Sequence, residues 1–176
     1  MVPEAPMEDR PGGKKPAGEG WFVINARDAA WIHNEKFGAG VTFEGEPEFS
    51  QCGINIQVML PGQPNGYYHG EQGQEDFLIV SGECLLLVEG QERRLRAWDF
   101  VHCPPWTEHV FVGAGDGPCA ILAVGTRTRG RVEYPESELA RRHNAGVEQR
   151  TTEPQEAYAK YAEDVPAAYR DGWLPG

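Results

Sequence analysis

The chain has 176 residues and a formal net charge of −11, with 27 acidic residues against 16 basic ones. This length suits one domain with a substantial core and is short for two. The negative charge argues against a nucleic-acid partner and against an anionic membrane surface, because both attract basic faces, so a small molecule or another protein is the expected partner.

The cysteines and the first residues bear on the compartment. No stretch approaches the roughly 18 apolar residues of a membrane-spanning helix, and residues 1–20 lack the apolar run of a signal peptide. The cysteines are scattered without a C-x-x-C pair, which is typical of buried thiols in a reducing compartment; they are Cys52, Cys84, Cys103 and Cys119. Cys103 is of most interest, since it lies shortly before His109. We predict a cytoplasmic protein.

Three regions follow from the composition. Residues 1–20 combine Pro, Gly, Lys and Glu without an apolar period, and such a segment cannot bury enough surface to offset the entropy of ordering. We therefore predict a disordered tail over residues 1–20. Residues 21–130 form the expected barrel domain, and residues 131–176 form a helical extension that packs on the barrel or on a partner subunit.

The pattern between residues 41 and 130 is typical of β structure. Residues 53–60 alternate apolar and polar side chains, which is the period of a strand with one buried face. Further strands are expected at 76–80, 84–88, 92–96, 100–103, 109–112 and 119–124. Short strands with a turn every eight to twelve residues indicate an all-β sandwich or antiparallel barrel.

Two of these strands do not alternate. The runs FLIV at 77–80 and CLLLV at 84–88 are apolar at every position, so both faces are expected to be buried. In a chain of this size the second cover is either a partner subunit or the C-terminal segment. We predict a homodimer on this basis.

The periodicity becomes helical after residue 131. Residues 135–143 carry acids early and bases late, as a helix with a satisfied dipole does. A capping-box pattern at 152–155 precedes apolar residues at helical spacing, Tyr158, Tyr161, Ala162 and Val165. We expect two short C-terminal helices, the second with an aromatic stripe packed against the barrel.

The best functional signal lies at the start of a core strand. His69, Glu71 and Glu75 stand at positions i, i+2 and i+6, which point to one face of a strand. A second histidine, His109, lies downstream in CPPWTEHVFV. The residue types predict a metal or substrate site built from these four side chains.

The spacing resembles the first signature motif of the cupin superfamily, which is a Gly, His-x-His, three or four residues, Glu, six residues and Gly. His69, Glu75 and Gly82 match its spacing, and Glu71 stands where the second histidine is expected. The resemblance covers about residues 40 to 126. It implies a cupin-type antiparallel β-barrel or jelly roll.

The second cupin motif runs Gly, five residues, Pro-x-Gly, two residues, His, three residues and Asn. Pro104 and His109 match it, while Trp98, Trp106 and Gly113 stand at the positions of its two glycines and its Asn. Cupins include isomerases, dioxygenases, decarboxylases, regulators and storage proteins, so the resemblance predicts the fold more sharply than the chemistry.

The donor set suits a divalent ion such as Zn, Fe, Mn or Ni. His69 and His109 are expected to bind as neutral imidazoles, with Glu75 supplying charge. Glu71 is either a fourth ligand or a catalytic base. Without Glu71 the set is two histidines and one carboxylate, as in non-haem iron oxygenases.

Other cavity walls can be named from strand parity. Phe77 and Ile79 share the ligand face of their strand, whereas Asn55 and Gln57 point either inward as hydrogen-bonding groups or outward to solvent. His102 is a further candidate, of uncertain parity relative to His109.

Three functions fit these features. The first is a metal-dependent enzyme acting on a small organic molecule, as an oxygenase, isomerase or lyase. The second is a non-catalytic cupin that binds a sugar or carboxylate as a sensor or carrier, and the third is a purely structural role. No basic helix-turn-helix accompanies the barrel, which weakens a DNA-binding regulator.

Overall fold

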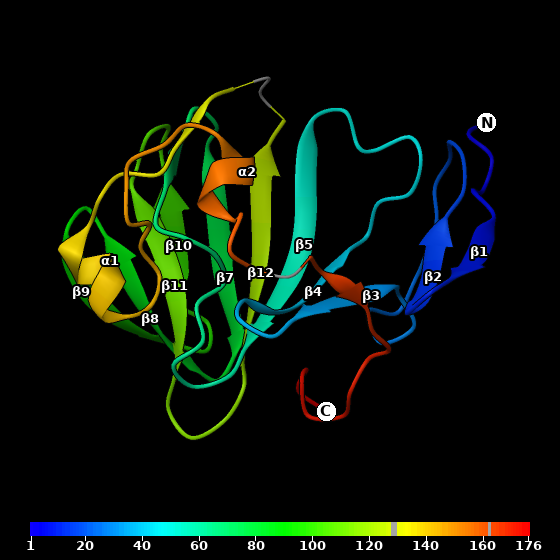
Figure 1. The fold of residues 1–176 in the computed structure, drawn as a ribbon. Coiled ribbons are helices and arrows are strands. Elements are labelled where there is room, and N and C mark those ends of the chain that lie inside the picture. The colour runs from blue at the N-terminus through cyan, green and yellow to red at the C-terminus, as the bar shows by residue number, and fades with distance from the viewer. Residues whose placement is uncertain (128–129, 162) are drawn as a thin grey trace.

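The computed structural model describes residues 1–127, 130–161 and 163–176, and nearly all of its regular elements are strands (Figure 1). The strands are β1 (Met7–Arg10), β2 (Gly13–Pro16), β3 (Trp31–Asn34), β4 (Gly38–Thr42), β5 (Cys52–Met59), β6 (Gly70–Glu71), β7 (Glu75–Ser81), β8 (Glu83–Val88), β9 (Gln91–Arg96), β10 (Phe100–Cys103), β11 (His109–Ala114), β12 (Cys119–Thr126), β13 (Val132–Glu133) and β14 (Val165–Pro166). The helices are α1 (Glu138–Arg142) and α2 (Pro154–Ala157).

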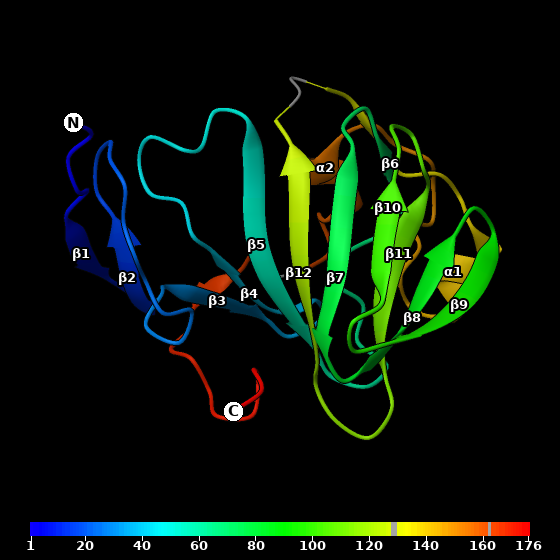
Figure 2. The ribbon, with the colours of Figure 1, turned by 180° about the vertical axis from the view of Figure 1, so that it is seen from behind.

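The strands form two facing antiparallel sheets. The larger sheet has the order β10-β7-β12-β5-β4-β3-β14, and the smaller has the order β11-β8-β9; the central strands of the larger sheet stand side by side in Figure 2. The core lies between them, where Phe77, Ile79 and Ile121 of the larger sheet pack with Leu86 and Phe111 of the smaller one. The expected all-β barrel of jelly-roll type is confirmed.

The alternation in residues 53–60 corresponds to β5, and each strand expected between residues 76 and 124 is present with its ends shifted by no more than two residues. Inward residues of neighbouring strands fall in register, for example Phe77 opposite Ala123 and Ala123 opposite Asn55. This register fixes which side chains reach the interior.

The N-terminal residues differ from the disorder expected for residues 1–20. They form the hairpin β1–β2, with Met7 paired to Pro16 and Arg10 to Gly13, at the right of Figure 1. Backbone hydrogen bonds fasten the hairpin to the neighbouring chain, including Lys14 N to Asp28 O at 2.8 Å. The ordering uses backbone hydrogen bonds and little apolar burial, so composition gives no sign of it.

The second cover of β8 comes from the C-terminal segment. Leu87 and Val110 are buried in a cluster with Ala140 of α1, and Leu85 and Leu139 pack against it. The Ser137 hydroxyl accepts a hydrogen bond from Ala140 N at 3.2 Å and caps this helix.

The second predicted helix is wrong beyond its first turn. Helix α2 ends at Ala157, its N-cap Glu153 makes no side-chain cap bond, and Val165 lies in β14, which pairs with β3. Residue 162 lies outside the described residues. Tyr158 and Tyr161 still pack in an aromatic cluster with Tyr67, so tertiary contacts replace the helix.

The described part of the chain holds no helix that is both long and apolar enough to cross a membrane.

Candidate metal centre

The two candidate histidines face each other across a backbone pairing. His69 N donates to His109 O at 3.1 Å, and His109 N donates to His69 O at 2.8 Å. Residues paired directly across antiparallel backbones carry their side chains on the same face, and the two imidazole centroids lie 5.1 Å apart. Sequence positions forty residues apart are thereby fixed as one unit.

Each imidazole is oriented by a backbone carbonyl two residues earlier. His69 Nδ1 donates to Tyr67 O at 2.7 Å, and His109 Nδ1 donates to Thr107 O at 3.0 Å. With the Nδ1 proton held in this way, the Nε2 lone pair of each ring is free to bind a metal.

Glu75, the first residue of β7, completes the group. Its Oε2 lies 3.3 Å from His109 Nε2 and 4.0 Å from His69 Nε2, and one ligand atom from each of the three residues falls within 4.8 Å of the others. Gly125 lies opposite Glu75 on β12, and a Cβ there would make an ordinary contact with Glu75 Cγ at 3.7 Å.

Burial disfavours charge on these groups when no cation is bound. Burial, then the charge of Glu71, raises the pKa of Glu75 to about 8. Burial, then the charge of His69, lowers the pKa of His109 to about 4, and burial also lowers the pKa of His69. At neutral pH the 3.3 Å contact therefore joins two uncharged groups rather than an ion pair.

These properties fit a divalent cation. Two neutral imidazoles aim Nε2 at the same space as a carboxylate that burial keeps from ionising, and a cation there would favour the carboxylate anion. The donor set has the composition of a two-histidine, one-carboxylate site. His69, Glu75 and His109 are the residues that would hold the ion.

Glu71 lies beside this group without joining it. It belongs to β6, which pairs with β13, and its side chain lines the cavity that contains His69, Glu75 and His109. Among the described residues the convergent ligand atoms are those of the other three alone.

The site opens into a cavity of about 720 Å³. Asn55 and Gln57 line it together with Phe77, so both point inward. Their strand, β5, lies between β12 and β4 and is not an edge strand. Asn65 Nδ2 donates to Gln57 Oε1 at 2.6 Å. The cavity size is that of an ordinary small-molecule site.

The remaining candidates lie elsewhere. His102 is on the outer side of β10, where its Nδ1 contacts Asp76 Oδ1 at 2.6 Å with half of its side chain exposed. Cys103 is paired with Glu75 across the strands but buried in the core, and burial raises the pKa of its thiol to about 12. Neither belongs to the convergent group.

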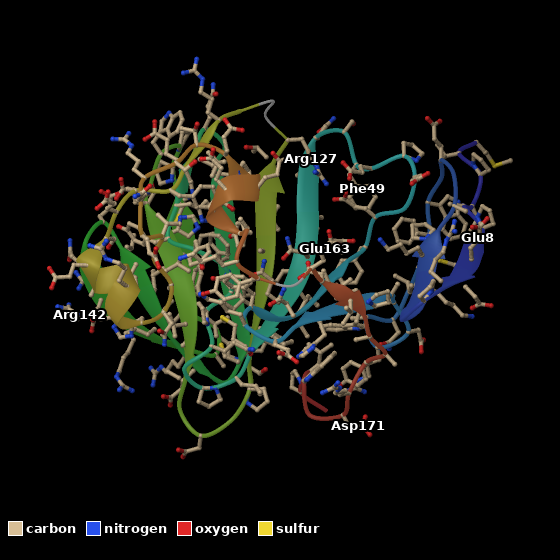
Figure 3. All side chains as sticks on the ribbon, viewed as in Figure 1. Glu8, Phe49, Arg127, Arg142, Glu163 and Asp171 are labelled. Carbon is tan, nitrogen blue, oxygen red and sulfur yellow. The ribbon has the colours of Figure 1, made fainter. Side chains whose placement is uncertain are left out.

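Sequence reasoning missed the charged residues at the cavity mouth. Arg127 follows β12 at the upper end of the sheet (Figure 3), where its guanidinium pairs with Glu44 and lies 3.4 Å from Glu48 Oε2. Glu44 is 5% exposed. Arg131 also lines the cavity. Residues 43–51 form a polar loop that returns to the end of β12. This is a long-range contact, which local sequence patterns do not reveal.

The two tryptophans at the motif's glycine positions keep the glycine backbone conformation. Trp98 has φ 76° and Trp106 has φ 70°, in the left-handed region that side chains with a Cβ rarely adopt. Gly113, at the Asn position, has no room for a side chain, because a Cβ would lie 2.2 Å from Leu60 O. The turns of the second motif are thus preserved despite the substitutions.

Comparison with known proteins agrees with this geometry. Residues 55–125 match the family model of the cupin domain, a span that holds His69, Glu71, Glu75 and His109. No curated protein sequence matches the chain.

Several solved structures share the fold. A sugar phosphate isomerase of a cupin superfamily from Silicibacter pomeroyi is 24% identical with a TM-score of 0.52, over 57% of this chain and 66% of that one, slightly under two-thirds of its length. The polyketide cyclase RemF from Streptomyces resistomycificus is 12% identical with a TM-score of 0.54, over 61% and 80%. A Cupin 2 conserved barrel domain protein from Salinispora arenicola is 21% identical with a TM-score of 0.50, over 61% and 89%. These likenesses show the fold, and the family match shows that residues 55–125 form a cupin domain.

Proposed function

We propose that this cupin is a metal-dependent enzyme that acts on a small polar molecule. The observation that carries the proposal is the convergence of His69 Nε2, His109 Nε2 and the Glu75 carboxylate within 4.8 Å, at the wall of a cavity of about 720 Å³. Three protein ligands leave further coordination positions for a substrate, as catalytic metal sites require.

The donor set favours Fe(II) or Mn over softer ions, and Zn and Ni remain compatible with it. When bound, such an ion polarises a substrate oxygen, and iron also supports oxygenase chemistry. An iron-loaded protein would be an oxygenase, whereas zinc, manganese or nickel would favour an isomerase or lyase.

Glu71 is proposed as the catalytic base rather than a fourth ligand. Its side chain lines the cavity beside the three ligands, and its charge is the second cause of the raised pKa of Glu75. A carboxylate near bound substrate but outside the ligand set is placed to take or give a proton.

Metal analysis of the purified protein tests the proposal. We expect one equivalent of a divalent ion in the wild type and in Glu71→Gln, and its loss in His109→Ala and Glu75→Gln. His102→Ala is the matched control, because this histidine lies outside the cavity. Full metal content in His109→Ala would contradict the ligand assignment.

The non-catalytic alternative also gains support from an observation, since the amide side chains of Asn55 and Gln57 can bind a polar ligand without a metal. In that case the wild type would contain no stoichiometric metal after purification in metal-containing medium. The same analysis thus separates the two functions.

We further propose a cytoplasmic homodimer. The cysteines are free, in keeping with a reducing compartment. A candidate interface is the outer side of β10 and β7, where Trp98 is 75% and Phe100 65% exposed. Phe100 lies opposite Leu78, and Leu78 opposite Leu122, so these outward residues form an apolar row.

A further inference from the structure

A row of two glycines, Gly125 and Gly53, lies next to Glu75 on the inner face of the large sheet. Glu75 is paired with Gly125, and Gly125 with Gly53, so two neighbouring strands carry no side chain in this row. Two strand spacings of about 4.8 Å separate Glu75 from Gly53 by roughly 10 Å. Both glycines line the cavity.

The guanidinium of Arg127 lies at the end of this glycine row, over Gly53. A Cβ on Gly53 would lie 3.4 Å from Arg127 Nη2 and 3.5 Å from its Cζ, so the guanidinium packs over this glycine. Glu44, which is buried, and Glu48 hold it in place through the two terminal nitrogens. Arg131 and Lys15 add positive charge to the cavity lining.

The side-chain amide of Asn55, next to the glycine row, has an oxygen without a hydrogen-bond partner. Asn55 lies one inward position further along β5 than Gly53, opposite Ala123, and lines the cavity. Within the described ranges, Asn55 Oδ1 is the buried side-chain atom that lacks a hydrogen-bond partner. A buried acceptor without a donor destabilises the folded state, so a hydrogen-bond donor supplied by a ligand would be favoured at this point.

We propose that the cavity binds a small hydroxy-dicarboxylate or a molecule of the same chemistry, with a hydroxyl between two anionic groups. One anionic group lies at the His69, Glu75 and His109 site, the hydroxyl donates to Asn55 Oδ1, and the second anionic group meets Arg127 at the mouth. The inference rests on the proposed metal-dependent function and adds the substrate class to it. Asn55 is the specificity-determining residue and Arg127 the anion-binding one.

Calorimetric titration of the metal-loaded protein with three probes tests this assignment. Malate has all three groups, succinate lacks the hydroxyl, and 2-hydroxybutanoate lacks the distal carboxylate. We expect malate to bind about tenfold or more tightly than either, which corresponds to one well-placed hydrogen bond or charge-assisted contact. The ligand series needs no variant, so a failure to fold cannot obscure it.

Asn55→Ala assigns the hydroxyl contact. The variant should bind malate and succinate equally while its metal content stays at the wild-type level, and Gln155→Ala, an exposed amide of α2, should keep the wild-type preference. Discrimination that persists in Asn55→Ala, or its absence in the wild type, would overturn the inference with the metal site intact. A protein without metal would overturn the proposed function itself.

Discussion

At the scale of single residues, Glu75 determines how the site responds to pH. Its carboxyl is held beside two uncharged imidazoles, and burial is the main reason that its pKa rises to about 8. The metal-free protein therefore keeps a proton on Glu75 that the unfolded chain has released above pH 4.5. This group by itself makes unfolding easier as the pH rises, because its unfolded form binds fewer protons.

We predict that the metal-free protein loses stability between about pH 6.5 and pH 8, by an amount on the order of 2 kcal/mol. Below pH 6.5 the lowered pKa values of His109 and His69 act in the opposite direction and offset the effect of Glu75. Glu75→Gln removes the ionisable group and should flatten this part of the profile. Urea unfolding at a series of pH values measures the effect. Equal slopes for the wild type and Glu75→Gln would show that the carboxyl ionises as readily in the folded state as in the unfolded one.

Addition of metal should reverse the trend. A divalent ion binds the ionised carboxylate, so its stabilising effect grows with pH and with the free ion concentration. We expect a higher melting temperature for the wild type in the presence of Fe(II) or Mn at pH 7.5, and no rise for His109→Ala. An equal rise in both would place the ion elsewhere.

Trp98 illustrates a residue whose type and backbone conformation disagree. Its φ of 76° suits glycine, and its side chain is 75% exposed, so little burial is lost on removal. Trp98→Gly should therefore exceed Trp98→Ala in unfolding free energy by about 1 kcal/mol, because alanine keeps the strained conformation. Thermal unfolding of both variants measures the difference, and an alanine variant as stable as the glycine one would rule out the strain.

At the scale of elements, sequence patterns identified the strands well and the contacts between them less well. Alternation in β5 and the apolar run in β8 are local properties, so they were recognisable. The backbone pairing of His69 with His109 could be expected only from the resemblance to cupins, because nothing local links positions forty residues apart. The position of Glu71 outside the ligand group depends on β6 pairing with β13, which no pattern in the sequence indicated.

The cover on β8 gives a prediction at this scale. Leu87 is fully buried beneath α1 in the cluster with Ala140, so Leu87→Ala should destabilise the fold by about 2–5 kcal/mol. Leu60→Ala is the control, since Leu60 is 50% exposed. Denaturant unfolding compares the two. Similar small losses would mean that α1 does not pack tightly on this strand.

At the scale of the whole molecule, the two faces of the large sheet differ in what covers them. Its inner face forms the core and the cavity, and the part of its outer face near β3 is covered by Trp173, which packs on Trp31 with centroids 5.0 Å apart. The outer residues toward β10 are more open, with Phe100 65% exposed. The apolar runs of β7 and β8 predict a dimer; α1 supplies the cover of β8, and the outer side of β10 remains open.

The proposed homodimer would bury this apolar row against its copy. Phe100 lies at the end of the row, on the edge strand β10, and a two-fold interface that pairs this edge with its copy brings Phe100 close to its own equivalent. Phe100→Glu therefore places two carboxylates in the interface and should convert a dimer into a monomer in light scattering, with the melting temperature of the isolated chain little changed because the side chain is exposed. Val23→Glu, at an 82% exposed position far from β10 in the sequence, should leave the dimer intact. A wild-type mass equal to one chain would contradict the homodimer, and a dimeric Phe100→Glu protein would place the interface on another face.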